Sequence, residues 1–154
     1  MDEMKRLIYH YFNDDDFLHI SGKIKEMEKT TSGEIRVAIK ERRNFLQRKK
    51  SIHQLAVGEF HKLKMNKTRH KTGILLYLLL HDKLFYILGD QGIHEKIGEE
   101  TWALVRDEIQ KHFKDGNFPE GILWGIERVG KILSEHFPVI IDGTNELSSE
   151  VVIE

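Results

Sequence analysis

The sequence predicts one α/β domain, in which helices cover both faces of a mixed β-sheet to form a three-layer α/β/α sandwich. Three observations support this fold class. The chain has 154 residues, 40% of them hydrophobic and none of them cysteine, as is typical of one globular domain without disulfide bonds. Helical and strand periodicities alternate along the chain. One continuous apolar run, at residues 73–80, fits a strand that is buried on both faces.

The first half of the chain predicts a helix, a strand, a second helix and a second strand. Apolar side chains recur at helical intervals at Phe17, Ile20, Ile24 and Met27. Ile35, Val37 and Ile39 alternate with Glu34, Arg36 and Lys40, with the two-residue period of a strand. The second helical stripe follows at Ile52, Leu55, Ala56, Phe60 and Leu63. The apolar run at 73–80 then completes a parallel crossover, and such crossovers are right-handed.

The second half predicts an antiparallel hairpin and two helices. A short turn at residues 81–83 joins the apolar run to another strand at 84–88. Two helical stripes follow, at Trp102, Val105, Ile109 and Phe113, and at Ile122, Ile126, Val129 and Leu133. Asn117, with Glu120 three residues later, predicts a capping box for the last helix. Three glycines in that helix, at 121, 125 and 130, indicate close backbone packing.

These elements place a single domain at residues 17–138, after an N-terminal extension at 1–16. The acidic tail at 139–154 is expected to be extended or loosely packed. The first residues lack the apolar core of a signal peptide, and no apolar run approaches the length of about 20 residues that a membrane helix needs. We therefore expect a soluble, cytoplasmic protein with no membrane span.

Charge is distributed unevenly, although the formal net charge is only −1. Residues 40–71 carry eleven Lys and Arg against two Glu, whereas the tail carries four acidic residues and no basic one. A group of these basic residues could contact nucleic acid or anionic lipid, namely Arg42, Arg43, Arg48, Lys49 and Lys50. We favour a mobile loop and a solvated helix face over a nucleic-acid partner, because the basic residues are not regularly interleaved with aromatic ones.

Candidate ligands for a metal emerge from the predicted topology. The sequence has no phosphate-binding glycine loop, no G-x-S-x-G elbow and no H-E-x-x-H zinc motif. The strand directions, however, bring Glu34, at the start of the first strand, to the same end of the sheet as Asp90, just past the third. Glu95, near the start of the following helix, adds a weaker third carboxylate. Carboxylates beside glycine-rich turns suit a hard cation such as calcium.

A structural interpretation of the same residues stays open. Asp90 can accept hydrogen bonds from turn amides, and Glu95 can stabilise a helix N-terminus, without any metal. A second acidic cluster, at residues 13–16, lacks the spacing of a calcium-binding loop and is typical of a solvated helix start.

Several motifs, in order, resemble those of the TPM domain family in its soluble, stand-alone bacterial branch. Residues 31–37, TSGEIRV, resemble the first-strand motif of the family, and residues 60–68, FHKLKMNKT, resemble the end of its second helix. Further segments resemble the family's hairpin, last helices and tail, at 72–77, 82–93, 112–118, 121–126 and 136–147. The resemblance covers residues 16–147.

The resemblance implies a Rossmann-like α/β/α sandwich and two classes of function. One is a calcium-binding, stress-related binding or accessory module with an unidentified protein or small-molecule partner. The other is a metal-assisted acid phosphatase. The sequence favours the first, because it does not place cationic groups beside Glu34 and Asp90. The apolar triplet at 139–141 is expected to add a short strand or a self-association patch.

Overall fold

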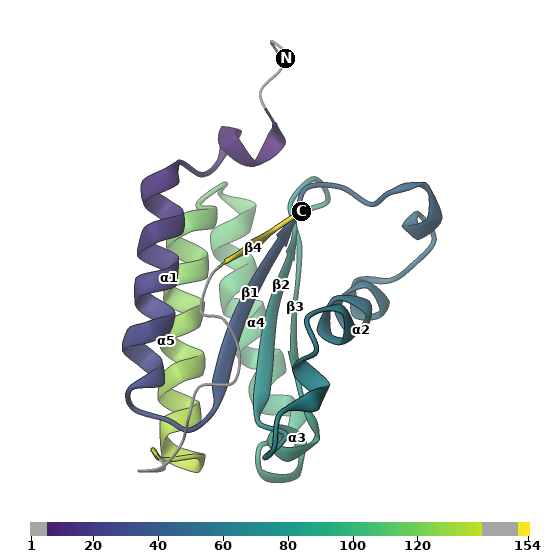
Figure 1. The fold of residues 1–154 in the computed structure, drawn as a ribbon. Helices are drawn as coiled ribbons and strands as arrows, with labels where there is room; N and C mark the ends of the chain where they lie inside the picture. Colours follow the sequence, from purple (N-terminus) through teal and green to yellow (C-terminus); the bar gives the residue numbers. More distant parts are fainter. Residues whose placement is uncertain (1–5, 140–150) are drawn as a thin grey trace.

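The computed structural model describes residues 6–139 and 151–154, and its centre is a four-stranded sheet in the order β3-β2-β1-β4 (Figure 1). The strands are β1 (Glu34–Lys40), β2 (Gly73–Leu79), β3 (Leu84–Gly89) and β4 (Val152–Ile153). β1 pairs in parallel with both β2 and β4, and β2 pairs antiparallel with β3. The predicted parallel crossover and antiparallel hairpin are therefore confirmed.

Helices cover both faces of this sheet, as the fold class predicts. α1 (Asp14–Glu28), α4 (Glu99–Lys114) and α5 (Phe118–His136) lie on one face, and α2 (Ile52–Lys62) lies on the other (Figure 1). A short α3 (Gln91–Lys96) follows β3 at the end of the sheet where β1 begins. Short 3-10 helices lie in the connections, at η1 (Leu7–His10), η2 (Phe45–Gln47) and η3 (Met65–Lys67). Among the described helices, none combines the length and the apolar character that a bilayer crossing requires.

The side chains of the sheet form two cores. β2 lies between two strands, and all of its residues are buried, which explains its continuous apolar run. Ile35, Val37 and Ile39 of β1 face the large core beneath α1, α4 and α5. The alternate side chains of β1 and β2, such as Ala38 and Tyr77, face a smaller core beneath α2. The apolar side chains buried on both faces of the sheet thus hold the three layers together.

Helix α5 packs closely against α1 and α4 at its glycines. A Cβ atom at Gly125 would lie 2.6 Å from the Ile109 Cδ1 atom of α4. One at Gly130 would lie 2.8 Å from the Met27 Cβ atom of α1. Neither position has room for a side chain in a close-packed interior. The close packing predicted for this glycine-containing helix is confirmed.

Three local features differ from the sequence predictions. Asn117 makes no capping hydrogen bond, because its backbone (φ −89°, ψ 61°) departs from the extended conformation of a capping residue. The helical segment after β3 is split into α3 and α4, because the backbone of Ile97 is extended. β4 lies within the acidic tail, where two residues are too short a pattern to predict a strand. Residues 140–141 of the apolar triplet lie outside the described residues.

Part of the N-terminal extension packs onto the domain. Ile8 of η1 and Phe12 are buried in the large core. Asn13 and Asp16 form a capping box at the start of α1, so the acidic cluster at 13–16 forms the beginning of this helix, as its composition predicts.

Candidate cation site at the start of strand β1

Glu34 and Asp90 lie in one row across three strands, at the end of the sheet where β1 begins. Glu34 is the register partner of Gly73 on β2, and the Asp90 N–H donates to the Gly73 carbonyl oxygen at 2.9 Å. Two strand spacings, about 10 Å, therefore separate the backbones of Glu34 and Asp90. Because cross-strand partners face the same side of a sheet, the two residues flank a position at Gly73 that has no side chain.

Of the two carboxylate oxygens of Asp90, the described part of the chain provides a hydrogen-bond partner for one. It is the N-cap residue of α3, and its Oδ1 atom accepts a hydrogen bond from the Gln91 N–H at 2.8 Å. Its Oδ2 atom is buried and has no hydrogen-bond partner among the described residues. A buried oxygen left in this way costs about 1–3 kcal/mol. The role of turn acceptor therefore accounts for only one of the two oxygens of Asp90.

The chain before β2 brings backbone carbonyl groups to the same end of the sheet. A Cβ atom at Gly73 would lie 3.4 Å from the Met65 Cε atom and 3.6 Å from the Met65 carbonyl oxygen, so Met65 of η3 covers the position between the two carboxylates. The Gly92 N–H donates to the Lys71 carbonyl oxygen at 2.8 Å, which holds this loop against α3. Carboxylate and carbonyl oxygens, both of which calcium accepts as ligands, thus lie together at this end.

A buried ion pair borders Glu34 on β1. The Glu28 carboxylate accepts a hydrogen bond from the Ile35 N–H at 2.8 Å and pairs with Arg36 Nη1 at 2.8 Å. Glu34 is 6% exposed and Arg36 is 3% exposed. Glu28 therefore covers an edge N–H of β1 beyond the residues that pair with β4. It also holds a cationic side chain two residues from Glu34.

The third predicted ligand lies apart from the other two. Glu95 is exposed on α3, beyond the turn that Asp90 caps. Across residues 6–139 and 151–154, no three His, Asp or Glu side chains come together in an arrangement that could hold a metal ion. A cation here would therefore need backbone carbonyl oxygens or water besides Glu34 and Asp90. Sequence reasoning did not identify the Met65 carbonyl group, because the position of a backbone carbonyl leaves no signal in residue type.

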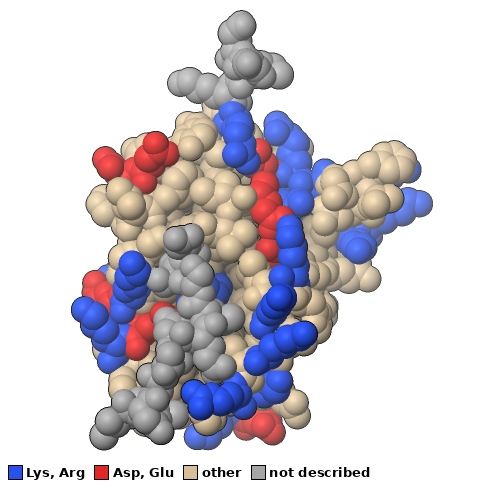
Figure 2. Space-filling model, viewed as in Figure 1, with Lys and Arg blue, Asp and Glu red and all other residues tan. Residues whose placement is uncertain are grey.

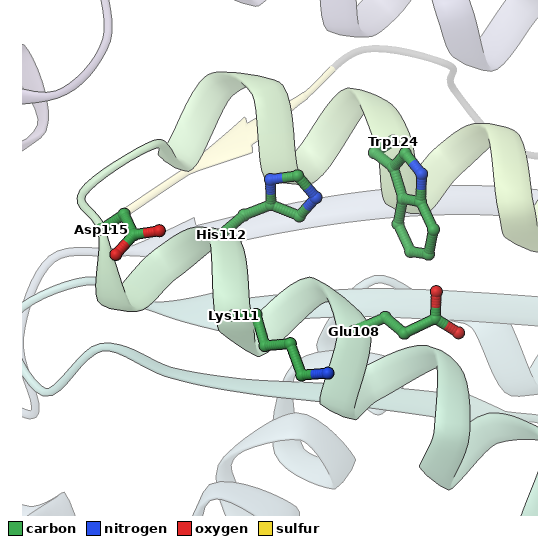
Figure 3. Close-up of a pocket in the computed structure, with 5 residues that line it drawn as sticks. All are labelled: Glu108, Lys111, His112, Asp115 and Trp124. Carbon is green, nitrogen blue, oxygen red and sulfur yellow. The ribbon is translucent and has the colours of Figure 1, made fainter.

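A second concave region lies between α4 and α5 (Figure 3). This open pocket has a volume of about 330 Å³ and is lined by Glu108, Lys111, His112, Asp115 and Trp124. Acidic and basic side chains mix in its lining, so its charge does not favour a ligand of either sign. None of the candidate ligands predicted from the sequence lines it.

Comparison with known proteins agrees with the fold and the motifs. A family model of the TPM domain matches residues 9–132. The NMR structure of the BA42 protein from the psychrophilic bacterium Bizionia argentinensis is 34% identical, with a TM-score of 0.83 over 94% of this chain and 96% of that chain. The solution NMR structure of the N-terminal domain of a protein from P. gingivalis is 15% identical, with a TM-score of 0.68 over 82% of this chain and 79% of that chain, and is similar in fold alone. The comparison with curated proteins finds no match. The family model and the similarity to BA42 show that the chain belongs to the TPM domain family.

Proposed function

We propose that this TPM-domain chain is a binding module that takes a divalent cation of the calcium class at Glu34 and Asp90. The observation that best supports the proposal is the buried Oδ2 atom of Asp90, which has no partner among the described residues. A cation would fill the place of the missing donor and offset the repulsion between two carboxylates at one end of the sheet. The Met65 carbonyl and water would supply further oxygen ligands, and Glu95 an outer, weaker one.

Asp90→Asn separates cation binding from folding. Asn caps a helix about as well as Asp, so the variant keeps the N-cap of α3 while it loses the negative charge. Without calcium, the variant should be at least as stable as the wild type, because a neutral amide replaces a carboxylate whose Oδ2 atom is buried. With calcium at about 100 times its Kd, the wild type should gain about 2.7 kcal/mol in the free energy of unfolding, and the variant should gain much less.

Amide chemical shifts during a calcium titration locate the site. The wild-type amides that shift most should lie around Glu34 and Asp90, and Glu34→Gln should weaken binding by about tenfold or more. Glu95→Gln should weaken it less. Glu120→Gln, which removes an exposed carboxylate from the first turn of α5, is the matched control. A melting temperature that millimolar calcium leaves unchanged would contradict the proposal.

The wider role proposed for the module is that of an accessory factor in a stress response, acting on a protein or small-molecule partner. Membership of the TPM domain family supports this role, and a family assignment alone does not define a function. The partner can be sought by calcium-dependent capture with the wild type and with Asp90→Asn. A partner captured equally by both would contradict the link between the cation and the wider role.

A metal-assisted phosphatase is the second candidate, and one observation favours it. Arg36 lies two residues from Glu34 on β1, and the backbone of His70 and Lys71 packs against Gly92 of α3, two residues from Asp90. Cationic groups beside a metal could hold a phosphoryl group while the metal activates water. Hydrolysis of p-nitrophenyl phosphate that needs a divalent cation, and that a Glu34→Gln, Asp90→Asn double variant loses, would favour the phosphatase. Hydrolysis that survives in the double variant would exclude this site as its source.

A further inference from the structure

The loop between β1 and α2 exposes two adjacent large apolar side chains. Phe45 is 74% exposed and Leu46 is 84% exposed, and both lie on η2. The loop projects away from the sheet on the side of α2 (Figure 1). Two neighbouring apolar side chains that remain in water at the tip of a projecting loop are typical of a contact surface rather than of a packing element.

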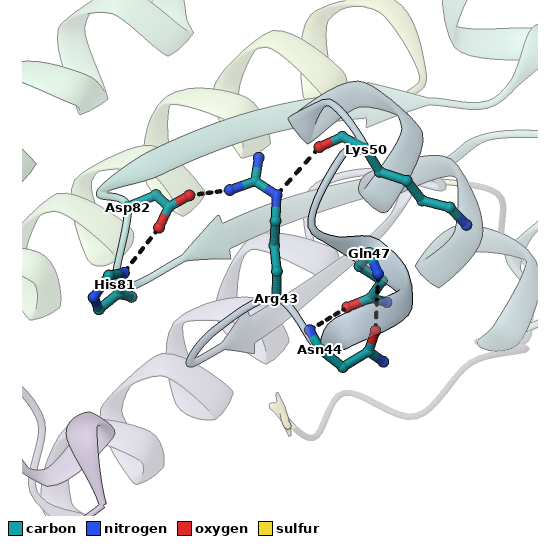
Figure 4. A network of polar contacts seen from close by, with 6 residues as sticks. All are labelled: Arg43, Asn44, Gln47, Lys50, His81 and Asp82. Atoms are coloured by element: carbon teal, nitrogen blue, oxygen red, sulfur yellow. Dashed lines mark hydrogen bonds and ion pairs between the residues drawn. The ribbon is translucent and has the colours of Figure 1, made fainter.

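Contacts within the loop and to the hairpin hold this apolar tip in place (Figure 4). Asn44 and Gln47 form a capping box, in which the Gln47 N–H donates to Asn44 Oδ1 at 3.0 Å and the Asn44 N–H donates to Gln47 Oε1 at 3.1 Å. Arg43 Nε donates to the Lys50 carbonyl oxygen at 3.2 Å, which closes the base of the loop. Arg43 also pairs with Asp82 in the β2–β3 turn. The loop at residues 42–50 therefore has a defined set of contacts within itself and with the hairpin.

Basic side chains surround the apolar tip. Four of them are exposed and have no acidic partner among the described residues, namely Arg42, Arg48, Lys49 and Lys50. The guanidinium of Arg48 lies 4.4 Å from the centroid of the Phe45 ring, so charge and apolar surface are adjacent. Asp82 is already paired with Arg43 and His81. Figure 2 shows Lys and Arg side chains, and no Asp or Glu, on the part of this face that projects at the right.

From this arrangement we infer that the loop at residues 42–50 docks the protein on an anionic lipid surface. Phe45 and Leu46 enter the boundary between headgroups and acyl chains, and the four basic side chains contact the anionic headgroups. The cation–apolar pattern fits a bilayer better than a nucleic acid, because Arg48 lies over the Phe45 ring and the aliphatic Leu46 offers no platform on which bases stack. This docking surface lies at the end of the sheet opposite to Glu34 and Asp90, and it does not depend on the cation site.

Vesicle co-sedimentation of the whole chain tests the inference. The wild type should bind phosphatidylcholine vesicles that contain about 30% phosphatidylserine, and should bind pure phosphatidylcholine vesicles much more weakly. Raising the salt from about 0.05 M to about 0.5 M should reduce the binding, because screening weakens contacts with headgroups. Phe45→Ser with Leu46→Ser should weaken binding by about tenfold or more, and so should an Arg48→Gln, Lys49→Gln, Lys50→Gln triple variant.

Two matched variants serve as controls. Leu18→Ser with Leu104→Ser removes two other exposed apolar side chains, which are 70% and 66% exposed, and should leave binding unchanged. Lys25→Gln with Lys29→Gln and Lys114→Gln removes three exposed cations elsewhere and should have a much smaller effect than the triple variant in the loop. The melting temperatures of all four variants show whether each one folds. If the Phe45→Ser, Leu46→Ser variant does not fold, the single variant Phe45→Ser takes its place.

Three results would overturn the inference. The first is an absence of binding to the phosphatidylserine vesicles. The second is an equal loss of binding in the loop variants and in their matched controls. The third is tight binding to a double-stranded oligonucleotide, measured by fluorescence anisotropy, that the triple variant loses and the Phe45→Ser, Leu46→Ser variant keeps, since the basic residues would then serve a nucleic acid without the apolar tip.

Discussion

Glu59 of α2 is a buried carboxyl group beside the carboxylate of Glu154. Its side chain is 7% exposed. Burial is the main cause, and a hydrogen bond to Glu154 the second, of a pKa of Glu59 that is raised to about 8. That hydrogen bond and the ammonium group of Lys62 lower the pKa of Glu154. Glu59 is therefore protonated at neutral pH and donates to an ionised Glu154, which joins α2 to the residue after β4.

We predict that the free energy of unfolding falls as the pH rises from about 5 to about 8. The pKa of Glu59 is raised in the folded chain, so its stabilising contribution is complete below the ordinary value of about 4.3 and is lost as the pH rises through about 8. The lowered pKa of Glu154 acts instead at acidic pH, where stability is lost as the pH falls through its folded value.

Glu59→Gln should remove most of this pH dependence of the free energy of unfolding. The change is on the order of a few kcal/mol, because the pKa is raised from 4.5 to about 8 and each pKa unit corresponds to about 1.4 kcal/mol. Urea unfolding at a series of pH values measures it. Glu120→Gln, at an exposed site, should keep the wild-type slope. A slope that is the same in Glu59→Gln and in the wild type would show that Glu59 does not carry a proton in the folded chain.

The elements of the fold differ in how well the sequence predicts them, and burial is the reason. β1 and β2 are predictable because alternation and a continuous apolar run reflect their positions in the sheet. β4 has only Val152 and Ile153, and its pairing with β1 joins residues more than 110 positions apart, so no local pattern marks it. The capping box expected at Asn117 does not form, because the turn between α4 and α5 sets the backbone conformation of this residue.

Two glycines on different helices should respond to alanine in opposite directions. Gly130→Ala should lower the free energy of unfolding by about 1–3 kcal/mol, because its Cβ atom would lie 2.8 Å from the Met27 Cβ atom and α5 would have to move away from α1. Gly22→Ala, on α1, should raise it by about 0.5–1 kcal/mol, because among the described residues the added carbon meets no atom within 4 Å beyond its chain neighbours and its own helix backbone, and alanine favours a helix.

Thermal or urea unfolding of both variants measures this difference in sign. Gly58→Ala, on α2, is a second open position and should behave like Gly22→Ala. Equal effects of Gly130→Ala and Gly22→Ala would mean that helix propensity, rather than the close approach of α5 to α1, decides the cost at residue 130.

At the scale of the whole molecule, topology is the part of the candidate site that the sequence could predict. Parallel pairing of β1 with β2 and reversal at β3 bring Glu34 and Asp90 to one end of the sheet. The Oδ2 atom of Asp90, buried without a partner among the described residues, and the nearby Met65 carbonyl could not be predicted, because they depend on how η3 and α3 close over that end. The contacts of the loop at residues 42–50 could not be predicted either, because the ion pair that holds it joins Arg43 to Asp82, 39 residues away.

The segment before α1 connects several layers of the molecule. The Phe12 ring stacks on Phe17 of α1, with 5.5 Å between ring centroids, and lies 6.5 Å from the ring of Phe118 on α5. The Ile8 N–H donates to Glu41 Oε2 at 2.7 Å, directly after β1. The segment thus contacts two helices and the end of the sheet, although it belongs to the N-terminal extension that the sequence separates from the domain.

We therefore predict that residues 7–12 unfold together with the rest of the chain. Phe12→Ala should lower the free energy of unfolding by about 3–5 kcal/mol, because a side chain that is 3% exposed leaves a cavity in the large core. Tyr9→Ala removes an aromatic ring that is 47% exposed and should cost about 1 kcal/mol or less.

Urea unfolding followed by circular dichroism and by tryptophan fluorescence tests whether this segment unfolds with the rest of the chain. Trp102 is 1% exposed and reports on the core beneath α4. The two probes should give coincident transitions that Phe12→Ala shifts equally. A fluorescence transition that Phe12→Ala leaves in place would instead mean that the extension folds on the surface of a domain that is stable without it.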